Sequence, residues 1–303
     1  MAILALKGDH PVEERTISNK TLRILLYLQK GEMTEHRIYQ KLSQRVKDTH
    51  NSEILKRIGE EELRHAQIWE KITKTKVGPN RLKAVFYSFL ALILGYTFVL
   101  KKMEKGEDKA TKFYATLISE VPQAKQISED EDRHEQQLLG MLDEERLHYV
   151  GSMVLGLSDA LVELSGTLAG LTFALQNTRL IALSGLITGI SATLSMASSE
   201  YLSAKNSGGK NAAKSSMYTG IAYLFTVTFM VLPYLLLESY LLALIIMLVT
   251  VVVIIMLFTY YTSVAKDLPF GKRFMEMALI SLGVAAISFV IGILVKRFLG
   301  IDI

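Results

Sequence analysis

Two segments of the chain carry a glutamate and a histidine three residues apart, a spacing typical of metal ligands on helices. Glu62 is followed by His65, and Glu131 is followed by His134. Side chains three residues apart share one helical face, so each pair could bind the same ion. The chain has no cysteine, which excludes disulfides, thiolate zinc sites, iron–sulfur clusters and a cysteine nucleophile. A bound metal would therefore be held by carboxylate, imidazole or thioether groups.

Two further acidic pairs precede these motifs. They are Glu32 with Glu35, and Glu104 with Glu107. The first pair falls within an apolar stripe, where an ionised carboxylate is costly unless it is paired or metal-bound. Tyr39 follows Glu32 by seven residues and Tyr114 follows Glu107 by seven, so a duplicated helical hairpin would make Glu107 the counterpart of Glu32. The hairpin lengths also allow Glu104. We interpret the other acidic residues beside the motifs as solvated surface charge: Glu60, Glu61, Glu129, Asp130 and Asp132.

The first half of the chain predicts a four-helix bundle. Four amphipathic segments are separated by polar residues, a Gly-Pro pair and Pro122, and they span residues 20–48, 51–76, 81–118 and 123–149. Residues 84–100 are apolar enough for a membrane span but slightly short, and a charged run follows them. We interpret this segment as a buried helix of the bundle.

The second half predicts a membrane domain of five helices. Five apolar stretches, each close to the ~20 residues that cross a bilayer, span residues 151–175, 180–203, 217–237, 240–263 and 277–299. Lysine and arginine concentrate in the loops after the second and fourth stretches, which predicts a cytoplasmic N-terminal domain and an outer C-terminus. We therefore expect an all-α protein with a cytoplasmic domain at 1–149 and a membrane domain at 150–303. No signal peptide is expected at the N-terminus.

Carboxylates lie inside the first two predicted spans. Asp159 and Glu163 are four residues apart in the first span, and Met196 and Glu200 are four apart in the second. A carboxylate within a membrane helix is expensive and marks an ion or proton pathway. Two carboxylates and a thioether suit Fe²⁺ or Mn²⁺ better than Mg²⁺ or Ca²⁺.

The chain resembles two known families. The paired Glu-x-x-His motifs are similar to those of the ferritin-like, rubrerythrin-like di-iron proteins, which place one Glu from each of two helices and Glu-x-x-His from the other two in a bundle. The segments around Asp159 and around Met196, Glu200, Tyr201 and Ser203 resemble the first two spans of the vacuolar iron transporter family. Glu163 is not part of that family's pattern. The combination resembles membrane-bound ferritin.

These resemblances imply a proton-coupled exporter of Fe²⁺, or of Mn²⁺, in the cell membrane. The bundle would capture the metal, with a di-iron site expected, and the membrane carboxylates would pass it outward. The family resemblance also implies a homodimer. The alternatives are a membrane-anchored ferroxidase or peroxide-scavenging enzyme without transport, and an iron sensor that gates a channel. The net charge of +4 is small and charges of both signs interleave in the first half, so nucleic acid is not an expected partner.

Overall fold

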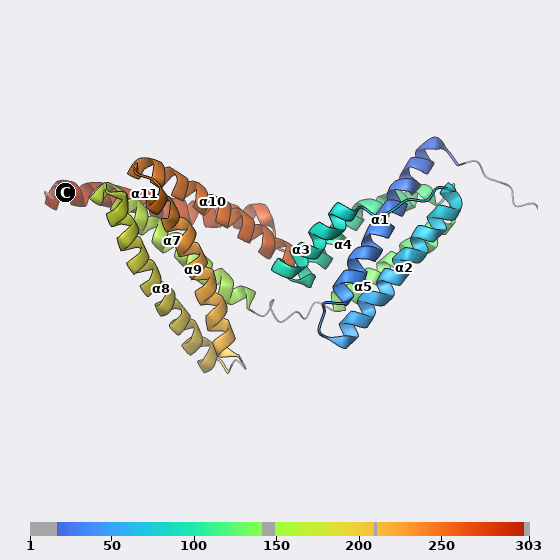
Figure 1. Ribbon diagram of the computed structural model, residues 1–303, viewed down its shortest axis with the longest axis horizontal. Coiled ribbons are helices and arrows are strands. Elements are labelled where there is room, and N and C mark those ends of the chain that lie inside the picture. The colour runs from blue at the N-terminus through green and yellow to red at the C-terminus, as the bar shows by residue number, and fades with distance from the viewer. Residues whose placement is uncertain (1–16, 141–148, 209–210, 300–303) are drawn as a thin grey trace, which may run out of the picture. The chain divides into compact units, whose positions relative to one another are not determined.

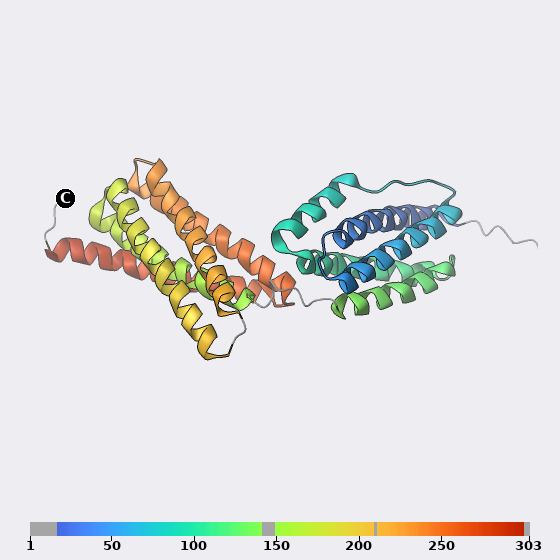
Figure 2. The same cartoon turned by 60° about the horizontal axis from the view of Figure 1, so that its bottom comes forward.

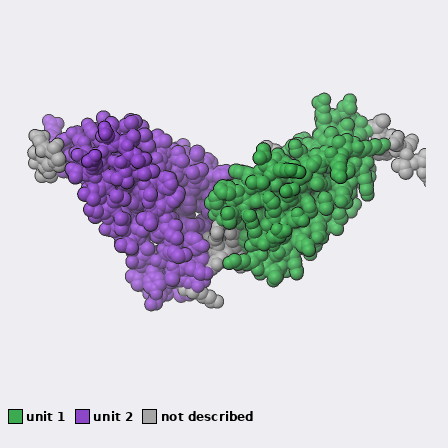
Figure 3. All heavy atoms as spheres, viewed as in Figure 1, with its two compact units in different colours: residues 1–142 green, residues 143–303 purple. Residues whose placement is uncertain are grey.

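The computed structural model describes residues 17–140, 149–208 and 211–299, without the side chains of residues 106–112, 115, 139 and 299. The described residues form helices in two compact units, residues 1–142 and 143–303, called unit 1 and unit 2 below (Figures 1 and 3). The predicted all-α fold class is confirmed. The predicted boundary between residues 149 and 150 stays a prediction, because residues 141–148 lie outside the described part of the chain.

Unit 1 contains a bundle of four helices and a fifth helix beside it. The helices are α1 (Asn19–Ser43), α2 (Thr49–Thr73), α3 (Arg81–Leu94), α4 (Tyr96–Leu117) and α5 (Gln123–Gly140). In the bundle α1 packs against α2 and α4, and α5 packs against α4 and α2. Ser18 and Asp48 cap the first two helices by accepting hydrogen bonds from backbone N–H groups of their first turns. Trp69, Leu25, Leu28 and Leu117 are buried together in the core.

The predicted helix over residues 81–118 is interrupted at Gly95. This residue has φ 91° and ψ 161°, a conformation that only glycine adopts without strain, and it separates α3 from α4. The early residues of α4, including Phe98 and Leu100, are buried as expected. The prediction of a buried helix is wrong for α3, because this helix lies along the outside of the bundle beside α1 (Figure 2) and most of its apolar side chains are exposed.

Unit 2 consists of five helices that are long and apolar enough to cross a membrane, as predicted. They are α7 (Val150–Leu175), α8 (Thr178–Asn206), α9 (Ala212–Leu236), α10 (Tyr240–Ala265) and α11 (Phe270–Leu299). The chain is therefore a multi-pass membrane protein. Helix α7 packs against all four other helices of the unit. It approaches α11 so closely that a Cβ atom on Gly292 would collide with the backbone of Gly170. The helix that carries Asp159 and Glu163 is thus the central helix of this unit.

Candidate metal centre

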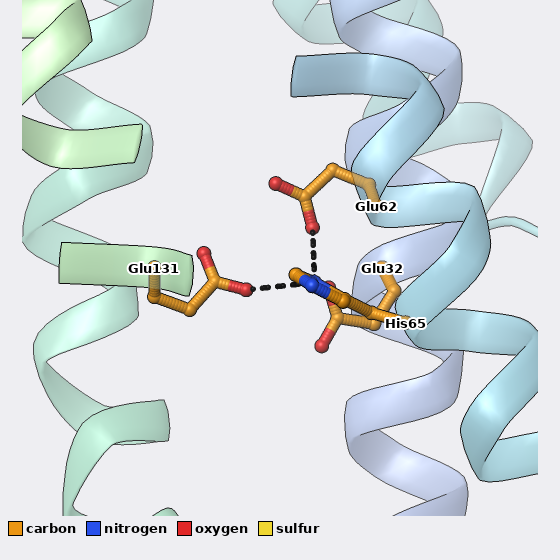
Figure 4. A group of neighbouring side chains, drawn as sticks. All are labelled: Glu32, Glu62, His65 and Glu131. Atoms are coloured by element: carbon orange, nitrogen blue, oxygen red, sulfur yellow. Dashed lines mark ion pairs between the residues drawn. The ribbon is translucent and has the colours of Figure 1, made fainter. Parts of the chain in front are cut away.

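Three helices of unit 1 bring four predicted ligands together in the bundle core. Glu32 comes from α1, Glu62 and His65 from α2, and Glu131 from α5, and one ligand atom of each lies within 4.8 Å of the others (Figure 4). The Nδ1 atom of His65 is 3.3 Å from an oxygen of Glu131 and 3.6 Å from an oxygen of Glu62. Glu32, Glu62 and His65 are at most 3% exposed. This arrangement is one that a divalent cation can bridge.

The second Glu-x-x-His histidine faces the same group of carboxylates. The Nδ1 atom of His134 lies 3.1 Å from Glu62 and 3.5 Å from Glu131. The imidazole rings of His65 and His134 stack with their centroids 5.8 Å apart. Both predicted motifs therefore contribute to one buried centre, although they lie almost seventy residues apart in the sequence.

A carboxylate on the opposite helix holds the outer nitrogen of each histidine. The Nε2 atom of His65 is 3.2 Å from Asp130 on α5, and the Nε2 atom of His134 is 2.6 Å from Glu61 on α2. In the tautomer protonated at Nε2, each histidine donates to its carboxylate and turns the Nδ1 lone pair toward the centre. The prediction of solvated surface charge was wrong for Glu61 and Asp130, whose side chains are only 15% and 22% exposed.

The arrangement of these outer carboxylates is reciprocal. Glu61 immediately precedes Glu62, and Asp130 immediately precedes Glu131, so each motif supplies one inner and one outer carboxylate. Arg133 joins the two outer groups, with its Nη2 atom 3.1 Å from Glu61 and 2.8 Å from Asp130. Arginine also precedes the other motif's histidine, so the repeated sequence is acid-Glu-x-Arg-His. That repeat is the signal in the sequence that could have identified these residues.

Four buried atoms of the centre have no hydrogen-bond partner among the described residues. They are one carboxylate oxygen each of Glu62 and Glu131 and the Nδ1 atoms of His65 and His134. Each lies within ion-pair distance of a carboxylate or an imidazole of the centre but without hydrogen-bond geometry. Buried polar atoms are rarely left unsatisfied, and these are all good ligand atoms for a transition metal. The donor set therefore fits a bound divalent cation.

Without a metal, most of the ligand groups bind protons more tightly than they would in water. Burial and then the neighbouring carboxylates raise the pKa of Glu32 and Glu62 well above the usual range. Burial also raises the pKa of Glu131, but the two imidazoles close to its carboxylate, His134 and His65, outweigh it, so this pKa is lowered. Burial lowers the histidine pKa values, but the nearby Glu131 carboxylate raises both above their usual value. The site thus holds protons that a bound metal would displace.

Two aromatic side chains bind the carboxylate of Glu32. The hydroxyl of Tyr114 donates to this carboxylate at 3.0 Å, and the indole N–H of Trp69 donates to the same oxygen at 3.4 Å. The two rings stack with centroids 6.3 Å apart. Tyr114 stands out in the sequence by its spacing from Glu107, whereas Trp69 was missed, since only the folded bundle brings it to Glu32.

In unit 2 the predicted carboxylates lie at two levels. Glu200, near the end of α8, accepts hydrogen bonds from Ser152 at the start of α7, at 2.7 Å, and from Ser215 at the start of α9. Deeper along α7, Glu163 accepts a hydrogen bond from the hydroxyl of Tyr223 at 2.9 Å. Sequence reasoning missed both serines and the tyrosine. They are common residues in membrane helices, and their roles depend on contacts between helices.

The other two predicted pathway residues have different surroundings. Met196 is one turn before Glu200 and packs against the hydrophobic core of unit 2. Asp159 is half-buried on α7, one turn before Glu163. Three helices thus line a series of polar groups that runs from the Glu200 end into the predicted hydrocarbon region.

Comparison with protein families finds two matches along the chain. Residues 24–149 match the rubrerythrin family. Residues 150–209 match the VIT family, so the two matches follow each other in the predicted order. No curated protein matches the chain. The matches indicate metal transport for the VIT-like part and iron binding for the rubrerythrin-like part.

Besides His134, three predicted ligands of the rubrerythrin-like part lie outside the group of four or cannot be assigned to it. Glu35 lies one turn after Glu32, 3.9 Å from Lys83, and burial raises its pKa to about 7 despite that charge. Glu104 is partly buried on α4 and does not join the group among the residues described. The side chain of Glu107 lies outside the described residues. Glu104 and Glu107 both stay open as the ligand from α4.

Proposed function

We propose that the protein exports Fe²⁺, or Mn²⁺, from the cytoplasm in exchange for protons, with unit 1 capturing the metal that unit 2 transports. The observation that supports this most is the group of unsatisfied, buried ligand atoms in unit 1, on a chain that also carries membrane carboxylates. In the proposed site Glu32, Glu62, His65, Glu131 and His134 bind the metal together with a glutamate from α4. Two metal ions are expected, as in di-iron proteins.

Proton exchange follows from the same chemistry. A metal can bind only after the carboxylates release their protons, because the cation and the protons compete for the same oxygen atoms. Glu32 and Glu62 have raised pKa values, so each capture event would release protons into the cytoplasm. Carboxylates in unit 2 would load and release metal by the same exchange, which couples the two fluxes.

The polar groups of α7, α8 and α9 support the proposed pathway. Ser152 and Glu163 are eleven residues apart on α7, which corresponds to about 16 Å along a helix at ~1.5 Å per residue. A metal would enter at Glu200 and Met196 and move to Asp159 and Glu163 near the middle of the span. The hydroxyls of the two serines hold Glu200 in place at the entrance.

The exposure of Glu163 supports the expected homodimer. Its side chain is exposed on the single chain although it lies within a spanning helix. A carboxylate facing lipid is costly, whereas a second copy could enclose it in a shared polar pathway. The positively charged connections between α8 and α9 and between α10 and α11 support a cytoplasmic unit 1, with Lys205, Lys214, Lys266 and Lys272 on that side.

Metal flux in proteoliposomes tests the proposal. We expect Fe²⁺ or Mn²⁺ uptake into vesicles to depend on an imposed pH gradient and to be lost in Asp159→Ala. The control is Glu238→Ala, because this carboxylate is exposed in the connection between α9 and α10. Equal flux in Asp159→Ala and the parent protein would remove the proposed transport site, and flux without proton counterflow would remove the coupling.

The aromatic pair at Glu32 favours a second candidate, a ferroxidase or peroxide-scavenging site anchored by unit 2. Two Fe²⁺ would each give one electron to hydrogen peroxide, which two protons would convert to water. Trp69 and Tyr114 could carry electrons at such a site because both contact a candidate ligand. Peroxide consumption that needs Fe²⁺, slows in Tyr114→Phe and persists in Asp159→Ala would favour this enzyme over the transporter.

A further inference from the structure

The outer face of α3 is the most exposed apolar surface of unit 1. Of the eight large apolar side chains of unit 1 that are exposed among the described residues, six lie on this helix. They are Leu82, Val85, Phe86, Phe89, Leu92 and Ile93, with Leu82 85% exposed and Leu92 63% exposed. Their spacing of three and four residues places them on one stripe, called the α3 stripe below. A stripe of this kind on a water-soluble domain marks a binding surface.

The inner face of α3 is attached to the bundle, so the stripe cannot simply turn inward. Ala84 and Ser88 are small, buried and one turn apart, which lets α3 lie close to α1. Arg45 donates a hydrogen bond to the carbonyl of Ser88 at 2.9 Å, and the N–H of Asn80 donates to the Thr34 hydroxyl at 2.9 Å. These contacts fix the helix with its apolar stripe on the outside.

The sequence around α3 carries charge of one sign. Residues 71–103 contain seven lysines and arginines and no aspartate or glutamate. Lys76, Arg81 and Lys83 are exposed at or before the start of the helix, and Lys83 lies 3.9 Å from Glu35 on α1. An apolar stripe flanked by basic residues is complementary to a bilayer surface that contains anionic lipid.

The dimensions of the chain agree with a helix lying on a membrane. Fourteen residues make a helix of about 21 Å, which is too short for the ~30 Å hydrocarbon core. Only residues 141–148 separate the last described residue of α5 from those that begin unit 2, so the chain can span at most about 30 Å between them. The bilayer is therefore always within reach of unit 1.

We propose that α3 docks unit 1 onto the surface of the bilayer, with the α3 stripe among the lipid headgroups and upper acyl chains and the basic residues on anionic headgroups. A second copy of unit 1 is the competing occupant. A two-fold contact through α3 would bring the same basic stretch of two copies together, with no carboxylate in that stretch to balance it. Charge therefore favours anionic lipid.

Fluorescence quenching on the full-length protein tests this docking. Because the chain has no cysteine, Phe89→Cys can be labelled at one position with an environment-sensitive dye and placed in nanodiscs. We expect nitroxide groups on the upper acyl chains to quench the dye at least twofold in discs that contain phosphatidylglycerol, and less in discs of phosphatidylcholine alone. The matched control is Gln126→Cys, exposed on α5, which packs against α4 and α2 and should not be quenched (Figure 2).

A second variant tests the stripe itself. Phe86→Glu in the Phe89→Cys background should reduce quenching to the level of the control, since it puts a charge in the middle of the stripe. Unchanged Trp69 emission would show that the bundle is still folded. Absence of lipid quenching at Phe89→Cys would overturn the proposal, whether the dye is in water or is covered by another segment or a second copy. Crosslinking between copies at this position, without lipid quenching, would identify the second copy as the occupant.

No metal enters this assay. A failure of docking would therefore leave the proposed transport untouched, and loss of transport in Asp159→Ala would say nothing about α3.

Discussion

Metal-free unit 1 is expected to lose stability as the pH rises from 5 to 8, and Glu35→Gln is expected to remove about 3 kcal/mol of that loss. The reason is the burial of several carboxylates without a cation. Burial raises the pKa of Glu35 to about 7, from 4.5 for an exposed carboxyl group. Burial and neighbouring carboxylates also raise the pKa values of Glu32 and Glu62 well above the usual range.

The sign follows from proton uptake. Between pH 4.5 and 7 the folded protein keeps the proton on Glu35 and the unfolded chain releases it, so raising the pH favours unfolding. Histidines with raised pKa values act in the same direction, since their stabilisation is lost as the pH rises through those values. Glu131 and Glu61 have lowered pKa values and act in the opposite direction, but only below about pH 4.5.

The magnitude for Glu35 alone is about 3 kcal/mol at pH 8, from ~2.5 pH units at ~1.4 kcal/mol each. Its side chain is 15% exposed, so solvent screening reduces this value only slightly. A typical domain is stable by about 5–15 kcal/mol, so the effect is a large part of the total. In urea it corresponds to a midpoint shift of about 1.5 M at a slope of ~2 kcal/mol per M.

The assay can use the full-length protein because Trp69 is the only tryptophan and is fully buried in unit 1. Urea unfolding followed by tryptophan emission, in chelator at pH 5 and pH 8, reports unit 1 alone. Glu35→Gln should raise the midpoint at pH 8 and change it little at pH 5. Glu53→Gln, at an exposed position on α2, is the matched control.

Equal metal-free midpoints at the two pH values would contradict a proton-linked loss of stability. The same holds if Glu35→Gln stabilises unit 1 no more than Glu53→Gln at pH 8. Adding Mn²⁺ should restore stability at pH 8 more than at pH 5, because the ligands are deprotonated there and binding to the folded state stabilises it.

Three further outcomes are expected. Glu61→Gln should weaken Mn²⁺ binding about 10–100-fold in a Trp69-emission titration, because the Glu61 carboxylate holds His134 in place. Glu60→Gln, at an exposed position, should have little effect. Gly292→Ala should destabilise unit 2 in detergent by more than 1 kcal/mol because the added methyl group overlaps α7; Gly283→Ala, on the same helix with open space around it, should not. Ser215→Ala should slow metal flux roughly tenfold, as a hydrogen bond to a charged group contributes ~1.5 kcal/mol, and unchanged flux would argue against the Glu200 entrance.

The candidate site was predictable from the sequence as far as its inner residues. Glu62, His65, Glu131 and His134 repeat one spacing, and that spacing alone predicts a shared helical face. The outer carboxylates Glu61 and Asp130 look like surface charge in the sequence, because a helix places neighbouring residues on different faces. Only the packing of α2 against α5 brings each of them to the histidine of the other helix.

By itself the sequence determined the helical class, the five membrane spans and the set of metal-ligand types, since periodicity and hydropathy are properties of single segments. Tertiary structure decided which side of each helix is covered. The apolar residues of α3 were expected in the core, but Gly95 turns the chain and α1 accepts only the small inner face of α3. Likewise the serines at Glu200 and the tyrosine at Glu163 gain their roles from helices that meet only in the folded protein.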